Sequence, residues 1–418
     1  MLQNFFQHNK EFKFKEALVL CGLAFLIFAS YALARPTLKS LLISHYTKDA
    51  LPIAWLIVGV VVTATVMVYS RFAATMSLKH LYQRVIAVCC VTLVIGMLLY
   101  QIGLTWVVFL LFVWKDVYIV VLAEMFWSMA SGLFHQKQAK WIYGFFCALG
   151  SLGGMTANFA VGPIANKIGT DHTPWMVIPV LLSSAFVVRF LPDMKPNKAK
   201  KKQKVDYIAG FRTVKKSSYL IPLMAIIALI QVAITLIDYQ CSGLVEVYYD
   251  TKDARTAIFG QMYGYIDIIS LCLQLSSGLI LSLIGVGGTL MGVPLILAGC
   301  LTVFLAAPSF LVMSIALIAG KSMDYSIYRA AKELLYLPLT REERTQGKAV
   351  IDMMTYRVAK GAASMTILVL AMWTAPTWAL STICLVLISG WFLCTWVLLP
   401  RYQKAAQDTP KEPLSATE

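Results

Sequence analysis

Charged residues are scarce in this sequence. Asp, Glu, Lys and Arg make up 14% of its 418 residues, whereas 59% are hydrophobic and the mean hydropathy is +0.72. An ordinary soluble domain carries about 25% charged residues. Apolar runs of about 20 residues, long enough to cross a bilayer, recur along the whole chain. The composition therefore excludes a soluble protein with a single anchor and predicts an α-helical protein with many membrane spans.

Several catalytic and metal-binding patterns are missing as well. The nine cysteines form no C-x-x-C pair, and the five histidines lie far apart without metal-ligand spacing. There is no G-x-x-x-x-G-K-[ST] phosphate loop and no H-E-x-x-H. We therefore expect no enzyme activity, no cofactor and no metal. The net charge of +15 comes from short basic connections between apolar runs, so we also expect no nucleic-acid partner.

Twelve apolar segments are predicted to cross the membrane as helices. The first follows a charged start and resembles a signal peptide, but neither a small-residue cleavage site nor a polar mature domain follows it. It is therefore kept as the first span. The predicted spans are 16–34, 51–69, 85–103, 106–132, 141–162, 175–192, 220–247, 258–284, 289–306, 309–333, 348–373 and 377–399.

The longest polar interruption divides the chain after six spans. We expect an N-terminal six-helix half over 1–192, a basic cytoplasmic linker over 193–218, a C-terminal six-helix half over 219–400 and a cytoplasmic tail over 401–418. Two such halves are the arrangement of the major facilitator superfamily, whose halves are repeats around a midplane site. The predicted fold class is all-α integral membrane, with about 12 transmembrane helices in two six-helix halves.

Basic residues concentrate in alternate connections between the spans. If the N-terminus is cytoplasmic, all of these connections lie inside, as the positive-inside rule requires. We therefore predict that both termini are cytoplasmic. The cations concerned, besides the lysines of the linker, are Arg71, Lys79, Arg84, Lys137, Lys140, Arg341, Arg344, Arg401 and Lys404.

Ionisable side chains inside the spans are the strongest functional signal. Each costs about 2.5–3.5 kcal/mol to insert, so it is retained for function unless it can reach the membrane surface. The first span ends in Arg35-Pro-Thr-Leu-Lys39, where the proline bends or ends the helix. If helical geometry persists, the two cations share one face. The alternative is that both reach the outer membrane surface.

The fourth span carries both signs of charge. Lys115, Asp116 and Glu124 lie within it, and the two acids share one helical stripe with Ser128. Glu124 is too deep to reach the surface. It either acts on a solute or pairs with a cation on another helix, and both alternatives place it in the interior.

The second half contains further charges within its spans. Glu246 lies near the end of the seventh span, and Asp267 lies well inside the eighth. In the tenth span a polar stripe runs from Lys321 through Asp324, Tyr325 and Tyr328 to Lys332. Glu246 and Asp267 are candidates for carrying a proton.

The tenth and eleventh spans are joined by a basic connection. Lys348, Asp352 and Lys360 lie on one face of the eleventh span, four or eight residues apart. Lys332 and Lys348 flank the connection, so an alternative role for both is to orient the chain. Lys360, a dozen residues into its span, is harder to explain in this way.

The surplus of cations indicates what the site binds. Lysine and arginine bind phosphate, and aromatic rings can stack on a base. Tyr118, Trp127, Tyr325 and Tyr328 are candidates for stacking, with helix packing as the alternative. We therefore predict a small anionic substrate, partly aromatic. The predicted substrate-binding residues are Arg35, Lys39, Lys115, Glu124, Glu246, Lys321, Lys332, Lys348, Asp352 and Lys360.

Five segments at these charged positions carry a family resemblance. They are Arg35-Pro-Thr-Leu-Lys39, the stretch from Tyr118 to Ser128, Ala139-Lys140-x-x-Tyr143-Gly144 with Gly150-x-x-Gly153-Gly154, Leu244-Val-Glu246-Val, and Lys332-Glu333-Leu-Leu-Tyr336-Leu-Pro338-Leu with Gly347 to Gly361. Together they resemble the ATP/ADP translocase family of intracellular bacteria and plastids. The last segment is the most specific.

The resemblance implies a facilitator-type fold and nucleotide exchange across a bacterial inner membrane. It also implies that Lys39, Glu124, Glu246 and a lysine of the eleventh span matter most. Ser40 and Ser131 depart from the family pattern, which usually has an acid and an asparagine there. Membership would make the substrate a nucleotide.

Three functional hypotheses follow. The first is nucleotide exchange by alternating access, in which cations neutralise phosphate and the loaded carrier rocks its two halves. The second is proton-coupled symport of another organic anion or nucleotide-related solute, with Glu124, Glu246 or Asp267 carrying the proton. The third is a membrane sensor that no longer transports. In each case we expect a monomer in the lipid bilayer.

Overall fold

The computed structural model of the chain describes residues 13–408 apart from 74, 135, 194–206, 341–342, 344–346, 352–354 and 374–376. Helices are the regular elements of that part of the chain, which contains no strand. The first half forms α2 (Phe14–Tyr46), α3 (Ala50–Ala73), α4 (Leu78–Gln101), α5 (Val107–Leu133), α6 (Gln136–Ile168), η1 (Thr173–Met176), α7 (Val177–Val187) and η2 (Val188–Phe190).

The second half is helical in the same way. It forms α8 (Tyr207–Lys216), α9 (Leu220–Tyr248), α10 (Lys252–Ala306), α11 (Phe310–Tyr325), α12 (Ile327–Leu335), α13 (Lys348–Val350), α14 (Tyr356–Met372) and α15 (Thr377–Asp408).

The helices have the length and composition of membrane spans. Within the described residues, eight are long and apolar enough to cross a membrane, and a ninth is added if α11 and α12 count as one bent span. A helix of 24 residues, such as α3 or α4, extends for about 36 Å, which exceeds the hydrocarbon core of about 30 Å. The predicted membrane class is therefore confirmed.

Each predicted span coincides with a helical segment. The eighth and ninth are joined in α10, where Gly285 has φ 69° and ψ 174° and so interrupts the helical geometry. A positive φ of this kind suits glycine, which has no Cβ to clash. For the eleventh span the structure describes α13 and α14, and residues 352–354 between them lie outside the described part.

Helix α2 continues through Pro36. The alternative that the helix ends at this proline is wrong, because α2 runs on to Tyr46. A proline within a helix removes one backbone hydrogen bond. Next to it, the Thr37 hydroxyl donates to the Leu33 carbonyl at 2.7 Å. Helical geometry therefore persists from Arg35 to Lys39, as the shared face of the two cations requires.

The tenth predicted span is not one straight helix. It is bent by 40° between α11 and α12, at Ser326. This residue has φ −123° and ψ −100°, which no α-helix contains. The predicted polar stripe from Lys321 to Lys332 is therefore wrong as a single helical face.

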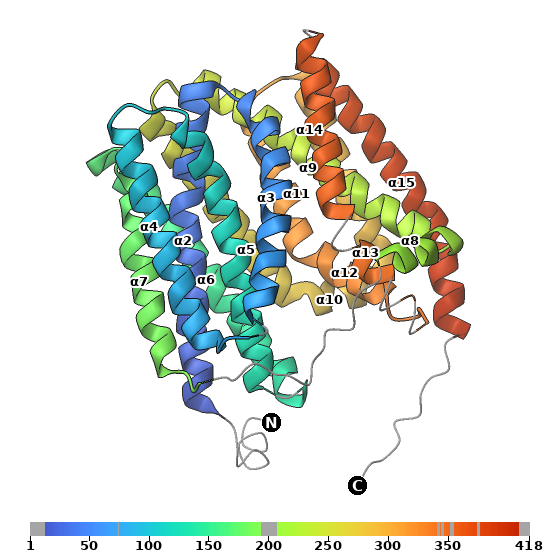
Figure 1. The fold of residues 1–418 in the computed structure, drawn as a ribbon. Coiled ribbons are helices and arrows are strands. Elements are labelled where there is room, and N and C mark those ends of the chain that lie inside the picture. Colours follow the sequence, from blue (N-terminus) through green and yellow to red (C-terminus); the bar gives the residue numbers. More distant parts are fainter. Residues whose placement is uncertain are drawn as a thin grey trace. The chain divides into compact units, whose positions relative to one another are not determined.

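The chain packs as two compact units. Unit 1 comprises residues 1–47, 60–199 and 249–268, and unit 2 comprises 48–59, 200–248 and 269–418. In unit 1, α2 packs against α5, α6 and α7, and in unit 2, α9 packs against α11, α14 and α15 (Figure 1). The predicted boundaries of the two halves stay a prediction, and most of the predicted linker lies outside the described residues.

Candidate functional site

The two cations of α2 lie in the interior of unit 1. Arg35 is half-buried, and Lys39 is 3% exposed. They are one helical turn apart, so both point to the same side of α2. Lys39 is therefore enclosed by other side chains of the protein.

Aromatic side chains of α10 contact both cations of α2. The guanidinium carbon of Arg35 lies 3.6 Å from the centroid of the Tyr263 ring. Lys39 Nζ donates to the Tyr263 hydroxyl at 3.4 Å and lies 4.5 Å from the Phe259 ring centroid. Such cation–π contacts are worth about 2 kcal/mol when they are desolvated. Both cations of α2 are thus held against aromatic rings of α10.

The carboxylate of Asp267 lies on the same face of α10 as these two rings. Phe259, Tyr263 and Asp267 are spaced by four residues and so lie on one stripe. Arg35 acts electrostatically on the Asp267 carboxylate, whose Oδ2 accepts a 2.8 Å hydrogen bond from Asn158 Nδ2. The Oδ1 atom of Asn158 is buried and has no hydrogen-bond partner among the described residues.

A second polar group of unit 1 surrounds Lys115 of α5. Lys115 is 3% exposed, and its Nζ lies 2.9 Å from Asp116 Oδ2. The other carboxylate oxygen of Asp116 accepts a 2.9 Å hydrogen bond from the Tyr31 hydroxyl. Lys115 Nζ also lies 3.8 Å from the Phe112 ring centroid. This lysine is therefore neutralised within unit 1 by its own neighbour.

Glu124 lies further along α5 and is half-buried. Its charge acts on the hydroxyl of Tyr69, a residue of α3 that is 8% exposed. The Tyr69 hydroxyl is buried and interacts with the Ser128 side chain, which lies one turn after Glu124 on α5. The prediction that Glu124 lies in the interior agrees with this position, and its role in transport stays a prediction.

Unit 2 has a buried lysine of its own. Lys321 of α11 is 6% exposed, and its Nζ lies 2.6 Å from Asp238 Oδ2 of α9. One turn later on α11, Asp324 Oδ2 accepts a 3.1 Å hydrogen bond from Gln231 of α9. Each unit thus pairs a buried lysine with an aspartate.

Glu246 and Lys360 have partners within unit 2. Glu246 Oε2 accepts a 2.9 Å hydrogen bond from the backbone N–H of Lys48, just before α3 begins. A carboxylate there is favourable, because the N-terminus of a helix carries unpaired N–H groups. Lys360 Nζ lies 5.4 Å from the ring centroid of Trp55 in α3. Glu246 therefore has a structural role, and its role in substrate or proton binding stays a prediction.

The cations around the predicted cytoplasmic connection are more open. Lys348 Nζ lies 2.6 Å from Glu333 Oε2 and 4.9 Å from the Tyr336 ring centroid, and Glu333 is half exposed. Lys332 is half-buried and acts electrostatically on Asp324. Asp352 lies outside the described residues.

Two of the predicted stacking residues serve as packing instead. Tyr118 is 2% exposed, lies 4.5 Å from the Trp114 ring between centroids, and approaches the Ser30 hydroxyl at 3.4 Å. Tyr328 is 3% exposed and packs edge-on against Trp391. Both rings therefore pack between helices, which was the alternative to stacking on a base.

Sequence reasoning missed several partners of these charges. They share one property, which is that they are neutral and therefore cost little inside a membrane helix. For Tyr263 and Phe259 a signal existed, because they precede Asp267 by four and eight residues and so share its helical face. These residues are Tyr31, Trp55, Asn158, Gln231, Phe259 and Tyr263.

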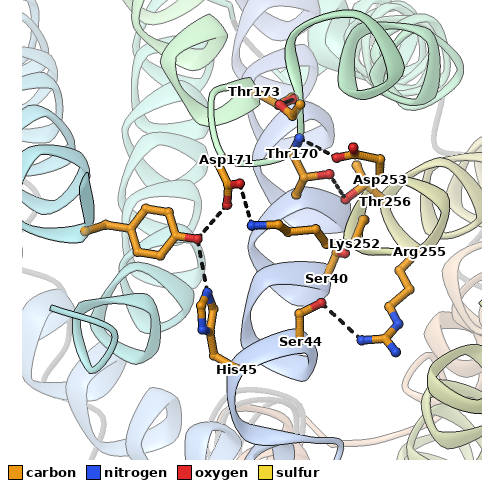
Figure 2. Close-up of polar contacts among 12 residues, drawn as sticks. Ser40, Ser44, His45, Thr170, Asp171, Thr173, Lys252, Asp253, Arg255 and Thr256 are labelled. Carbon is orange, nitrogen blue, oxygen red and sulfur yellow. Dashed lines mark hydrogen bonds and ion pairs between the residues drawn. The ribbon is translucent and has the colours of Figure 1, made fainter. Parts of the chain in front are cut away.

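A dense polar network lies at one end of unit 1 (Figure 2). Asp171, in the loop between α6 and η1, forms an ion pair with Lys252 at the start of α10 and accepts a 2.5 Å hydrogen bond from Tyr100 of α4. The Tyr100 hydroxyl also lies 3.0 Å from His45 Nε2 of α2. Burial raises the pKa of Asp171, but the hydrogen bonds from Lys252 and Tyr100 and the positive charge of Lys252 together lower it by more, so its pKa lies below the usual value.

Further contacts of this network fix the first turn of α10. Asp253 Oδ1 accepts a 2.6 Å hydrogen bond from the backbone N–H of Thr170, whose hydroxyl donates to Thr256 at 2.9 Å (Figure 2). Ser40 of α2 donates to the Lys252 carbonyl at 2.6 Å. These contacts therefore fix the N-terminal end of α10, close to the Phe259 and Tyr263 rings that contact Lys39.

The fold is that of solved membrane transporters. Over 92% of this chain and 99% of the other, it is similar to a variant of the nucleoside transporter NupG, with a TM-score of 0.71 and 12% identity. It is also similar to a bacterial homologue of the iron transporter ferroportin in an inward-facing state, over 94% and 99% of the chains, with a TM-score of 0.66 and 12% identity. The predicted major facilitator-type fold is confirmed.

Sequence comparisons agree on one family. Curated relatives are ADP,ATP carrier protein 1 of Rickettsia typhi, 22% identical over 59% of this chain and 57% of the carrier, and ADP,ATP carrier protein 5 of Rickettsia felis, 25% identical over 70% and 68%. The chain thus spans little more than half the length of the first of these relatives. Residues 287–402 match the family described as TLC ATP/ADP transporter, which confirms the resemblance that the sequence predicts.

Proposed function

We propose that this protein is a membrane transporter of nucleotides that exchanges one nucleotide for another by alternating access. The observation that carries the proposal is the pair of cations on one face of α2, half-buried Arg35 and buried Lys39, held against aromatic rings on a transporter fold. A buried cation is costly unless something compensates its charge. A polyanionic substrate supplies that compensation, and the named carriers among the relatives make a nucleotide the preferred class.

The roles of the site residues follow from their chemistry. Arg35 and Lys39 bind phosphate oxygens, since Arg offers a planar fork of N–H groups and Lys a point charge. Lys115 and Lys321 each have an aspartate partner, and they exchange that partner for phosphate when substrate is present. Further members of the proposed site are Glu124, Glu246, Lys332, Lys348, Asp352 and Lys360.

Exchange follows if the empty carrier rarely reorients. Cations gathered in one site repel one another, and a polyanion relieves this repulsion in both half-open forms. The proposal includes a monomer in a bacterial inner membrane with both termini cytoplasmic, and neither an enzyme activity nor a nucleic-acid partner. The orientation rests on the positive-inside rule.

Uptake of labelled nucleotides tests this function. Bacterial cells that express the protein receive labelled ATP, ADP, other nucleotides and nucleosides, with and without an uncoupler. We expect saturable uptake of at least one nucleotide that excess unlabelled nucleotide abolishes and the uncoupler leaves intact. The absence of saturable nucleotide flux in all of these conditions contradicts the proposal.

A specific observation favours a second candidate function, proton-coupled symport. Asp267 is an acid within a membrane helix, and the Asn158 amide beside it has an unpartnered oxygen that a protonated carboxyl could use as an acceptor. Such residues mark proton relays in transporters. Uptake driven by a pH jump into cells without internal nucleotide supports this candidate, and its abolition by the uncoupler separates it from exchange.

The third candidate, a sensor that binds without transport, makes a different prediction. The purified protein would then bind nucleotide, seen as a shift in its thermal unfolding, while membranes containing it show no flux. Flux above that of control membranes excludes this candidate.

A further inference from the structure

Tyr263 is absent from the residues that the sequence singles out, yet it touches both cations of α2. We infer that Tyr263 is a positioning residue, which sets how Arg35 and Lys39 are presented to the phosphates of the substrate. The inference rests on the proposed function, since it concerns the same nucleotide site. It adds a neutral residue that determines how strongly phosphate is recognised.

The geometry distinguishes Tyr263 from the other rings nearby. Arg35 lies 3.6 Å from the Tyr263 centroid but 5.9 Å from that of Tyr31. Lys39 Nζ donates to the Tyr263 hydroxyl at 3.4 Å, whereas Phe259 offers it only a ring face at 4.5 Å. Tyr263 is therefore the one of these rings that contacts one cation through its face and the other through its hydroxyl.

The position of Tyr263 is rigidly defined. It is 2% exposed, and its ring stacks on that of Phe259 at 6.4 Å with an interplanar angle of 18°. Gly260, between them, lies so close to α6 that a Cβ there would be 2.6 Å from the Asn158 carbonyl oxygen. Tight contact between α10 and α6 thus fixes the ring.

This arrangement suits phosphate binding for a physical reason. A guanidinium over a ring contacts the ring with its face, so its N–H groups, which lie in its own plane, point away from the ring and keep the planar geometry that suits phosphate oxygens. Lys39 can exchange a neutral hydroxyl acceptor for a charged phosphate oxygen. Because both long side chains are ordered before the substrate arrives, binding loses less rotamer entropy. Tyr263 therefore contributes affinity without touching the substrate.

The test compares substitutions at Tyr263 with matched ones at Tyr265, which is on the same helix, half exposed and away from both cations. Tyr263→Phe keeps the ring and removes only the acceptor, so we expect KM for ATP to rise about threefold. Tyr263→Leu removes both contacts, and we expect KM to rise about 30-fold with kcat changed far less. Tyr265→Phe and Tyr265→Leu should keep the wild-type KM.

A second readout separates positioning from a general structural role. The rise in KM for Tyr263→Leu should be larger for ATP than for AMP, because more phosphates depend on the two cations. A wild-type KM in Tyr263→Leu, or an equal rise for ATP and AMP, overturns the inference while the proposed function stands. Wild-type protein that moves no nucleotide overturns the proposed function, and the inference falls with it. If Tyr263→Leu does not fold, Tyr263→Phe still decides, since a KM equal to wild type for both nucleotides overturns the inference.

Discussion

Gly153 of α6 lies directly against the backbone carbonyl group of Phe25 in α2. A Cβ at position 153 would be 2.8 Å from the Phe25 carbonyl carbon, and backbone atoms cannot turn aside as a flexible side chain can. We expect Gly153→Ala to destabilise the packing of α2 on α6 by about 1–3 kcal/mol, the usual cost of overpacking. Because α2 carries Arg35 and Lys39, transport should fall as well.

A matched variant is available on the same helix. A Cβ at Gly144 of α6 would have no neighbouring atom within 4 Å. Gly144→Ala should therefore unfold at the wild-type temperature or slightly above, since alanine favours a helix. Thermal unfolding in detergent measures both variants. Equal unfolding temperatures for Gly153→Ala and Gly144→Ala would show that the close approach of α2 and α6 is not needed.

The buried ion pair of unit 2 gives a second prediction. Asp238→Asn leaves Lys321 buried without its carboxylate, and breaking such a pair costs about 3–5 kcal/mol. The double variant Asp238→Asn with Lys321→Met removes the uncompensated charge and should regain much of the stability. Chemical unfolding of the purified protein measures all three forms. If Asp238→Asn alone were as stable as the wild type, other groups would have to neutralise Lys321.

The ion pair between Asp171 and Lys252 predicts how stability depends on pH. Hydrogen bonds lower the pKa of Asp171 in the folded protein, so its contribution is complete above the ordinary aspartate pKa of about 4 and is lost as pH falls through the lower folded value. Asp171→Asn should therefore unfold at a lower temperature than wild type near neutral pH, with the difference disappearing in strong acid. Both side chains are about one third exposed, so the effect is modest and shrinks with salt.

Exchanging the two charges provides the control for this ion pair. Asp171→Lys with Lys252→Asp restores an attraction but places the new carboxylate away from Tyr100. We expect it to be more stable than either single substitution. A double variant no better than the single ones would show that the two charges do not interact.

The sequence was sufficient to predict most of the fold. The hydrophobic runs predicted where the helices lie, because a lipid environment requires an apolar surface and this requirement is local. The sequence pattern could not show whether α2 continues beyond Pro36. The answer depends on the Thr37 hydroxyl and on the packing of α2, which outweigh the backbone hydrogen bond that the proline removes. The bend at Ser326 was also missed, because no proline or glycine marks it.

The candidate site could be predicted only in part. Charges within spans are conspicuous, so Arg35, Lys39 and Lys115 were found from the sequence alone. Their neutral partners were not, since a tyrosine such as Tyr263 is an ordinary residue in a membrane helix and acquires its role only from α10 packing on α2. The hydrogen bond between Glu246 and the backbone of Lys48 joins residues far apart in the sequence, which no local pattern encodes.

Substitution of charged residues tests the site assignment. Lys39→Ala, Glu124→Ala and Lys360→Ala should each reduce nucleotide transport by at least tenfold while the protein still inserts into the membrane, because each removes a charge from the proposed site. Lys404→Ala is the control, since Lys404 is exposed near the end of α15. Uptake per molecule of inserted protein is the measurement. Normal transport in all three variants would refute the site even if the protein carries nucleotides.

Exchange itself is tested most directly with purified protein in liposomes. The vesicles are loaded with unlabelled ADP or left empty, and labelled ATP is added outside in the absence of any ion gradient. We predict saturable accumulation of label in the loaded vesicles and almost none in the empty ones, because the unloaded carrier rarely reorients. Equal uptake by empty and loaded vesicles, or no uptake by either, would contradict nucleotide exchange.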